Sequence, residues 1–464
     1  MRSPKTAALA VAAGLAAVPA LALVPTAGAT PGPCTVHDTT TGHLATYTGT
    51  GALQAAVNAA TPADALAVSG TCAGDTAVTK HLTISGPATL SGTGTPGSVV
   101  TIAHGVSASL AGLDITGGTG NFDVNGYAPI TFGGGIDNEG RLALTNVTVA
   151  GNTAGNGGGI FNDVGATLSL GGTRGTSVSA DLATGRGGGG IYNYKGTVTS
   201  TNAGINHDTA VGTGVIGGGG IFNDDGKVVL GSHTTAGTSV SWNSAPDGAG
   251  IDNYGTGSHL TITNGRVNRN AAIYIGGGIK NWAGNAATLI GTSVDANTAR
   301  YGAGLYSDGP LALRSDAVNG NSAGVWGGGI FNDVHGSLSV VATTIHGNHA
   351  ASVGGGIASD APATLIGDTI GANTSGAGGG GIYSSHTTLT LTRTSVTRNT
   401  APRGGGIYAW GVGKVRLRVG ATVTRNRATV HKGGGGIFYF SGTALVGVSA
   451  GHNVRLNVNG NVVA

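Results

Sequence analysis

The chain has 464 residues, of which 91 are glycine, and only 9% of its residues are charged while 39% are hydrophobic. The glycines follow no Gly-X-Y period, which excludes a collagen helix, and the low charge with a large apolar fraction argues against an expanded, disordered chain. The formal net charge of +3 is modest, and we expect one ordered structure.

The first 29 residues have the pattern of a secretory signal. Arg2 and Lys5 precede the apolar run AALAVAAGLAAVPALALV, and small residues end the segment at Ala29, which predicts cleavage before Thr30. The alternative is an uncleaved anchor, although the run is near the lower limit for a spanning helix. No second such run follows. We therefore expect a secreted or cell-surface protein with no transmembrane domain after signal removal.

Residues 30–80 are expected to form an N-terminal cap. They contain Cys34 and Cys72, and an even pair in an exported protein predicts a disulfide. Closing that loop would contribute roughly 4 kcal/mol by a chain-entropy estimate. Between the cysteines, GALQAAVNAA places Leu53 and Val57 on one face of a short helix. Such a helix would cover the open end of a solenoid, where an exposed strand edge would template aggregation.

A repeat dominates the rest of the chain. Runs of glycine that close with an aliphatic residue recur about 27 residues apart. Between consecutive runs lie an alternating pair such as Leu311/Leu313 and then an aliphatic residue followed three positions later by Asn or Asp, as in VAGN ending at Asn152. Each repeat therefore contains three short strand signals separated by turns. The twelve closing residues are Ile136, Ile160, Ile191, Ile221, Ile251, Ile279, Leu305, Ile330, Ile357, Ile382, Ile407 and Ile437.

Three strands in fewer than about 30 residues leave no room for a covering helix, so each repeat must stack on its neighbours. Stacking places each strand beside the same strand of the next coil, about 4.8 Å away. This predicts an all-β, right-handed parallel β-helix with three sheets. We expect the solenoid to span residues 81–440, with about two irregular coils between Leu82 and Ile115, and residues 441–464 to form a strand tail.

The glycine runs are interpreted as corners between sheets. A phosphate-binding loop would need Lys and a hydroxyl residue directly after the glycines, and a calcium-binding nonapeptide array would need Asp on a period of about nine. Neither pattern is present. Glycine instead allows the positive φ values and close backbone approach that a sharp corner requires.

Two columns of Asn are expected to form hydrogen-bonded ladders between coils. One lies two residues after the closing aliphatic residue, where Ser307, Ser359 and Ser384 stand in other coils; the other is the Asn of the VxxN motif. The first ladder contains Asn138, Asn162, Asn193, Asn223, Asn253, Asn281 and Asn332. The second contains Asn270, Asn297, Asn321, Asn348, Asn373, Asn399 and Asn426.

The pattern VxxNxA, eight to thirteen residues before GGGI(F/Y), resembles the FxxN and GGAI repeats of the chlamydial polymorphic outer membrane protein family and of related bacterial β-helix proteins. The resemblance covers roughly Arg141 to Phe440, with Val or Ile where the family has Phe. It implies a surface-exposed adhesin with a β-helix passenger.

Parallel β-helices also include pectate lyases and polygalacturonases, so the alternative function is that of a polysaccharide lyase or glycoside hydrolase. Such enzymes need two carboxylates facing one cleft, or a calcium cluster beside a basic residue. Asn223-Asp224-Asp225 superficially resembles the polygalacturonase Asp pair but occupies a repeated turn position. His346 and His349 flank a ladder residue without Cys or a third His nearby, so we interpret them as turn residues rather than zinc ligands.

Asp308, Asp333 and Asp360 occupy one position, three residues after the closing aliphatic residue, in consecutive coils. In register they would lie about 5 Å apart, so either a calcium ion lies among them or their pKa values rise. The alternative is a row of separate, solvated turn residues.

Aromatic residues recur one position after the closing aliphatic residue. Strand alternation points them away from the core, so they would form an outward row of rings that suits sugar faces or a partner protein. The alternative is packing beneath long turns. The residues predicted to bind are Tyr306, Phe331, Tyr383, Tyr408 and Phe438, and Phe161, Tyr192 and Phe222 share their position.

Charge is unevenly distributed along the chain. Residues 30–368 carry 11 basic and 20 acidic side chains, whereas residues 369–464 carry ten basic and no acidic ones. Arg398 and Arg425 occupy one place in consecutive VxxN motifs and should stack about 5 Å apart, which costs repulsion unless an anion lies across them. With Arg416 and Arg427 they predict attraction to polyanions. The alternative is solubility and protection of the C-terminal edge.

The sequence as a whole predicts an exported, non-catalytic rod for binding or adhesion. The expected partners are anionic cell-envelope polymers or glycans, or surface proteins of a host or partner, rather than nucleic acid. No cofactor is expected apart from calcium at the Asp column.

Overall fold

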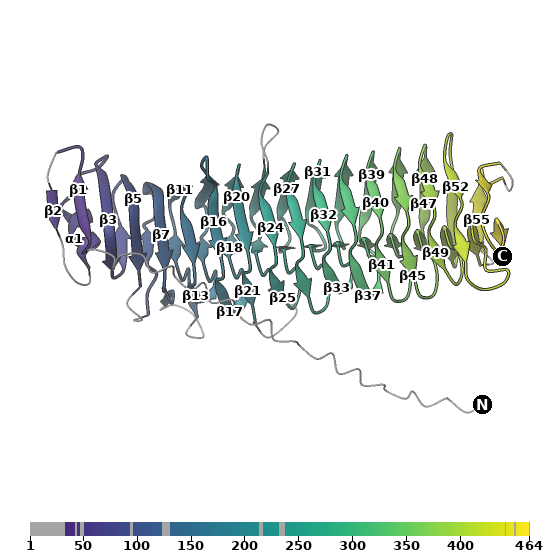
Figure 1. The fold of residues 1–464 in the computed structure, drawn as a ribbon, viewed down its shortest axis with the longest axis horizontal. Helices are drawn as coiled ribbons and strands as arrows, with labels where there is room; N and C mark the ends of the chain where they lie inside the picture. Colours follow the sequence, from purple (N-terminus) through teal and green to yellow (C-terminus); the bar gives the residue numbers. More distant parts are fainter. Residues whose placement is uncertain are drawn as a thin grey trace, which may run out of the picture.

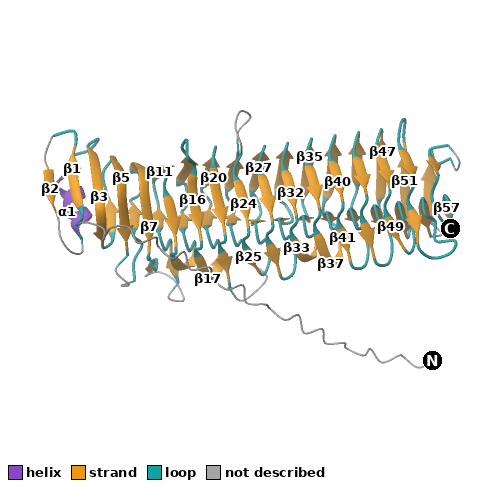
Figure 2. Ribbon diagram, in the orientation of Figure 1, coloured by secondary structure: helices purple, strands orange, loops and turns teal. Residues whose placement is uncertain are grey.

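A computed structural model describes residues 33–41, 44–46, 51–92, 96–122, 130–212, 217–231, 237–440, 442–449 and 452–463. The predicted signal, residues 1–29, lies outside the described residues. The described chain forms a long rod of stacked coils, with the N-terminal elements at one end and the last strands at the other (Figure 1). Among these residues the only helix lies at the N-terminal end of the rod, and the rest of the rod is built from strands (Figure 2).

The strands form three sheets of 29, 15 and 13 strands, which confirms the predicted all-β parallel β-helix. In a typical coil, β34 belongs to the 15-stranded sheet, β35 and β36 to the 29-stranded sheet, and β37 to the 13-stranded sheet. Each strand pairs in parallel with its counterpart in the next coil, β38 to β41. The bounds are Leu305–Ser307, Pro310–Arg314, Ala317–Asn319 and Ser322–Trp326 for β34 to β37, and Ile330–Asn332, Ser337–Val341, Thr344–His346 and His349–Ala350 for β38 to β41.

Each typical coil therefore has four strands, where the sequence indicated three. The alternating pair and the VxxN motif both supply strands to the 29-stranded sheet, and the strand of the 13-stranded sheet follows the ladder Asn. That fourth strand has no strong apolar signal, because it buries only alanines such as Ala299, Ala323 and Ala350.

The main core is a continuous stack of aliphatic side chains. In the coil that begins with β38, the inward residues are Ile330, Leu338, Val340 and Ile345, and none is more than 3% exposed. Ile330 pairs with Leu305 before it and Ile357 after it, so the same apolar position repeats from coil to coil and the register is fixed by burial.

The glycine runs form the corners, as predicted. The first glycine of a run has a positive φ, which is 57° at Gly302 and 66° at Gly327. The third glycine is needed for space: a Cβ on Gly329 would lie 2.6 Å from the carbonyl oxygen of Gly356 and 3.1 Å from Nδ2 of Asn348. The glycine run and the VxxN motif therefore pack against each other.

Both Asn ladders are present and buried. In the first, Nδ2 donates to Oδ1 of the next Asn at 2.7 to 2.8 Å from Asn138 through Asn281, and Ser307 then accepts from Asn281 at 3.0 Å. In the second, equivalent bonds of 3.0 to 3.1 Å run from Asn243 through Asn426. The ladders satisfy buried amide groups that would otherwise destabilise the fold; the exception is Oδ1 of Asn332, which has no described partner.

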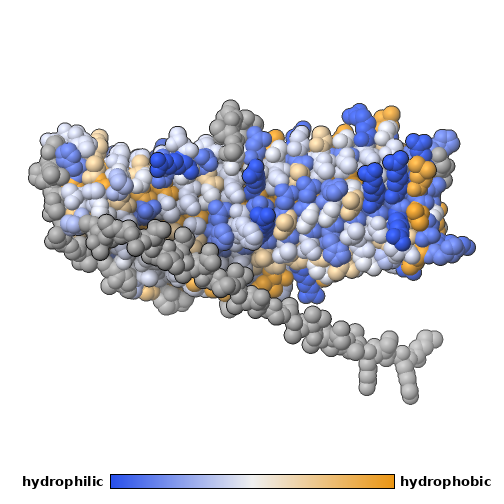
Figure 3. All heavy atoms as spheres, viewed as in Figure 1, coloured by the Kyte–Doolittle hydropathy of each residue, from blue (hydrophilic) through white to orange (hydrophobic). Residues whose placement is uncertain are grey.

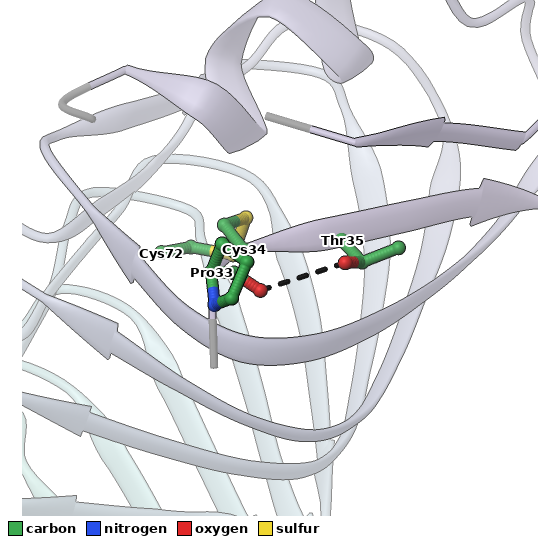
Figure 4. Close-up of a disulfide and its surroundings, with 4 residues drawn as sticks. All are labelled: Pro33, Cys34, Thr35 and Cys72. Carbon is green, nitrogen blue, oxygen red and sulfur yellow. Dashed lines mark hydrogen bonds between the residues drawn. A yellow bond between two sulfur atoms is a disulfide. The ribbon is translucent and has the colours of Figure 1, made fainter. Parts of the chain in front are cut away.

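The N-terminal end is closed by the predicted cap. Cys34 and Cys72 form a disulfide (Figure 4), and α1 (Ala52–Ala59) buries Leu53 and Val57. Parallel pairing already begins between β3 (Ala65–Ala73) and β5 (Leu82–Ser91). The first coil thus lies inside the segment expected to be cap.

The C-terminal tail is a further turn of the solenoid. β55 (Thr443–Val446) and β56 (Val454–Arg455) extend the 29-stranded sheet. β57 (Val462–Val463) extends the 15-stranded sheet through its pairing with β54 (Ile437–Tyr439).

Candidate functional site

The predicted outward row of aromatic rings is not an exposed platform. Tyr306 is 8% exposed, Phe331 5% and Tyr408 7%, while Tyr383 and Phe438 are half-buried. The expectation of exposed ring faces is therefore wrong for this column, and the alternative of packing beneath turns describes it. Strand alternation correctly points these residues away from the aliphatic core, but a second layer of chain covers them.

The cover comes from the end of the 13-stranded sheet and the turn that follows it. Tyr301 and Trp326, at the ends of β33 (Thr298–Tyr301) and β37, contact Phe331 at ring-centroid distances of 6.4 and 5.7 Å. Phe161, Tyr192 and Phe222 form an equivalent buried cluster nearer the N-terminus. These clusters are structural cores outside the main stack.

The most exposed rings of the C-terminal coils lie beside the column, at positions that the sequence reading did not single out. Trp410, at the end of β50 (Ile407–Trp410), and Phe440 are 39% and 38% exposed, with ring centroids 4.1 Å apart. The guanidinium of Arg403 lies 5.9 Å from the Phe438 ring. This exposed pair is suited to a sugar face.

Asp308, Asp333 and Asp360 are in register, but they do not converge on a metal site. Asp308 accepts the backbone N–H of His335 at 3.0 Å and contacts its ring, whereas Asp333 accepts the hydroxyl of Tyr306. Burial, together with the nearby charge of Asp333, raises the pKa of Asp360 to about 6. Within the described residues, no group of three or more His, Cys, Asp or Glu side chains is arranged to hold a metal ion. The geometry therefore does not support the calcium site.

The other acidic and histidine motifs also have local partners. Asp224 accepts the Tyr192 hydroxyl at 2.8 Å, and Asp225 accepts the backbone N–H of Thr256 at 2.7 Å. His346 and His349 are both exposed. Asp224 ends β22 (Ile221–Asp224), and His346 and His349 lie in β40 and β41. The expectation of turn positions is therefore wrong for these three residues and holds only for Asp225, which lies in the bend after β22.

Arg398 and Arg425 project from the same corner of adjacent coils. They follow β48 (Ser395–Thr397) and β52 (Thr422–Thr424), whose residues Thr397 and Thr424 are paired. Both arginines have positive φ values, 57° and 58°, and both are exposed. The left-handed corner is set by the fold, because the residue before the ladder Asn also has a positive φ in other coils, including the alanines at 296 and 372.

A second basic group lies on β51 (Gly413–Leu417). Lys414 and Arg416 alternate with the buried Val415 and Leu417, so they share the outward face of the strand, and Arg418 directly follows its end. With Leu417 and Val446 these three cations line a shallow, open pocket of about 500 Å³. Hydrophilic side chains gather over the C-terminal coils on the face seen in Figure 3.

Arg427 belongs to the corner group rather than to the β51 group. It begins β53 (Arg427–Ala428) in the 13-stranded sheet and is exposed. Arg425 and Arg427 flank the buried ladder residue Asn426. The structure thus divides the predicted basic residues between a corner of the solenoid and the face of the 29-stranded sheet.

The most unusual charged group was missed by sequence reasoning. Lys280 is completely buried with Asp247 and Asp252, and its Nζ lies 3.2 and 3.4 Å from their Oδ2 atoms. Lys280 and Asp252 stand one residue after Ile279 and Ile251, at a position that is aromatic in the flanking coils, which carry Phe222 and Tyr306. A charged residue at a position that is aromatic in neighbouring coils was the signal that could have revealed the group.

No family model, curated protein or solved structure matches the chain. The fold itself defines the chain as a parallel β-helix. Among the described residues, no helix has both the length and the apolar character needed to span a bilayer.

Proposed function

We propose that the protein is an exported binding rod whose C-terminal coils hold an anionic polymer of the cell envelope, by binding rather than by catalysis. The observation that carries the proposal is the pair Arg398 and Arg425, exposed on one corner of adjacent coils in a segment, residues 369–464, that contains no acidic residue. Two stacked cations without a carboxylate nearby repel each other. An anion lying across them would relieve that repulsion.

The repetition of the coils favours a polymer over a small anion. Adjacent coils are about 4.8 Å apart, so a chain with regularly spaced phosphates or carboxylates can contact several coils at once. The corner arginines and the β51 cations offer such contacts. The exposed Trp410 and Phe440 could add stacking against sugar rings of the polymer.

The export signal predicted for residues 1–29 and the resemblance of the repeats to those of surface-exposed adhesins support an extracellular place of action. The enzymatic alternative has less support. Three shallow pockets on the 29-stranded sheet have no Asp or Glu in their linings, whereas glycan cleavage by this fold needs facing carboxylates or a calcium cluster.

The test is retention of the secreted protein on isolated cell walls at low and high salt. The variant replaces Arg398, Arg416, Arg425 and Arg427 with Ser. The control replaces four exposed cations of the acidic body, Arg141, Arg174, Lys227 and Arg266, with Ser. Retention of wild type and control should fall steeply as salt shortens the screening length, and the variant should be lost already at low salt. Equal retention of all three proteins would contradict the proposal.

A further inference from the structure

Two charged residues interrupt the buried aromatic column in the middle of the rod. Asp252 lies in β26 (Ile251–Tyr254) and Lys280 in β30 (Ile279–Asn281), and the two are directly paired. Phe222 precedes them in the column and Tyr306 follows. The two charged side chains are therefore enclosed along the rod by ring clusters.

Lys280 contacts two carboxylates in this enclosure. Its Nζ lies 3.2 Å from Oδ2 of Asp247 and 3.4 Å from Oδ2 of Asp252, and the three side chains are 0%, 1% and 0% exposed. Nζ also lies 4.4 Å from the centre of the Trp282 ring. The backbone N–H of Ile275 donates to Oδ1 of Asp247 at 3.2 Å. No described residue donates to Oδ1 of Asp252.

This arrangement is costly as a set of ions. One ammonium faces two carboxylates, so a charge of −1 remains where water is excluded, and buried ions lose much of their hydration energy. Burial raises the pKa of both aspartates, that of Asp252 to about 6, although Lys280 opposes the shift. The enclosure therefore brings together a nucleophile, an acceptor and a proton carrier.

We propose that Lys280 and Asp247 are joined by an intramolecular isopeptide bond, and that Asp252 transfers the protons during its formation. Asp252 accepts a proton from the ammonium of Lys280, and the neutral amine attacks Cγ of Asp247. The new bond joins Nζ to Cγ, and the bond from Cγ to Oδ2 breaks. Two of the three ammonium protons leave with that oxygen as water, one remains on the amide, and Asp252 returns to its starting state.

Asp247 is assigned as the acceptor for two reasons. Its Oδ2 is the nearer of the two to Nζ, and the N–H of Ile275 polarises the carboxyl through Oδ1. That donor would also hold the oxygen on which negative charge develops during attack. Asp252 has a free Oδ1 and a raised pKa, which suit a group that carries protons.

The bond would close a loop of 33 residues between adjacent coils. A solenoid is held together only by contacts between neighbouring coils, so a covalent link in mid-rod would prevent those two coils from separating. The inference concerns the body of the rod and does not depend on the proposed polymer binding.

The test is the intact mass of the folded, full-length secreted protein. We expect a mass lower than that of the mature sequence with its disulfide by one water molecule. The Lys280→Met variant should have the full mass calculated from its sequence, without the loss of water. The Lys227→Met variant, at an exposed lysine in β23 (Lys227–Leu230), should still lack one water. The Asp252→Asn variant should also have its full calculated mass, while its circular dichroism spectrum remains that of the wild type.

A competing product must be excluded, because Asp247 is followed by Gly248 and an Asp-Gly succinimide has also lost one water. Hydroxylamine opens a succinimide but leaves an isopeptide bond intact, and fragmentation of a digest should yield a branched peptide that links Lys280 to Asp247. A folded protein at full mass, or a water loss that survives in Lys280→Met, would overturn the proposal. A branch at Asp252 would overturn the assignment of the acceptor.

Discussion

The side-chain amide of Asn321 donates to Oδ1 of Asn348 in the next coil, at 3.0 Å. Both residues are completely buried, so this bond joins two coils inside the solenoid. The same contact recurs through the second ladder, which means that each Asn has a donor on one side and an acceptor on the other. The ladder therefore ties the stability of each coil to that of its neighbours.

Replacing Asn321 with Leu should strongly destabilise the rod. Oδ1 of Asn321 accepts from the backbone and the side chain of Asn297, and its Nδ2 donates to the carbonyl of Val294. Each buried group left unpaired costs roughly 1 to 3 kcal/mol. The denaturant midpoint measures the loss. Asn319→Leu is the matched control, because Asn319 is only half-buried and its Oδ1 has no described partner; equal midpoints for the two variants would contradict the ladder.

The second prediction concerns the glycine corners: the loss of stability caused by a Gly→Ala substitution should depend on where the glycine lies in the coil. Gly329→Ala would place a Cβ 2.6 Å from the carbonyl oxygen of Gly356 and should cost about 3 kcal/mol or more. Gly347→Ala would meet nothing within 4 Å, and alanines with positive φ occupy that corner in other coils. It should cost about 1 kcal/mol. Melting temperatures compare the two variants, and a larger drop for Gly347→Ala would be inconsistent with the packing described.

The fold could be predicted from the sequence because the same pattern, a glycine corner followed by a buried aliphatic residue, recurs twelve times. A single glycine run or VxxN motif is ambiguous, but Ile330 and its counterparts fix the register and the ladder Asn fixes the corner. The fourth strand was not accessible, since Ala323 and Ala350 give no apolar alternation.

The site was less accessible, because exposure depends on what covers a strand. Phe331 points away from the main core as expected, but Trp326 at the end of the preceding strand β37 packs over it, and no local pattern indicates that contact. The Lys280 group was missed for a similar reason. Asp247 joins Lys280 from across a glycine corner, and its position relative to the sheet follows from the turn rather than from strand periodicity.

Two acidic members of the second ladder predict a pH dependence. Asp181 accepts from the backbone and side chain of Asn152, and Asp208 accepts the backbone N–H of Asp181, but Oδ2 of each aspartate has no described partner. Burial raises the pKa of both carboxyls well above the usual 3.8. The folded state therefore keeps protons that the unfolded chain releases above about pH 4, and stability should fall as the pH rises from there.

The double variant Asp181→Asn, Asp208→Asn should remove part of that dependence. Asn keeps the acceptor oxygen and supplies the donor that a carboxyl has only when it is protonated. The denaturant midpoint should therefore rise at pH 8, by roughly 1 to 3 kcal/mol in free energy, and change little at pH 4. Some slope should remain, because burial also raises the pKa of Asp137 and Asp316 to about 7. Asp114→Asn, at an exposed position, is the control. Unfolding curves of the double variant that match those of wild type at both pH values would refute the explanation.

The corner arginines make the final prediction, which separates polymer binding from mere solubility. If Arg398 and Arg425 only keep the rod soluble, neutralising them should not change how a polyanion affects the folded state. If they bind the polyanion, it stabilises the folded rod by an amount that increases with its concentration and its affinity. The probe is linear polyphosphate added during thermal unfolding at low ionic strength, where the melting temperature of wild type should rise.

The variant Arg398→Gln, Arg425→Gln should show a clearly smaller rise, and Arg141→Gln, Arg266→Gln, which removes two exposed cations from the acidic body, should match wild type. Without polyphosphate the corner variant should be no less stable than wild type, because it loses a repulsion rather than an attraction. At about 1 M salt the screening length falls to roughly 3 Å, which is shorter than the coil spacing, and the difference between the proteins should vanish. A rise of the same size in the corner variant at low salt would leave these arginines with no role beyond solubility.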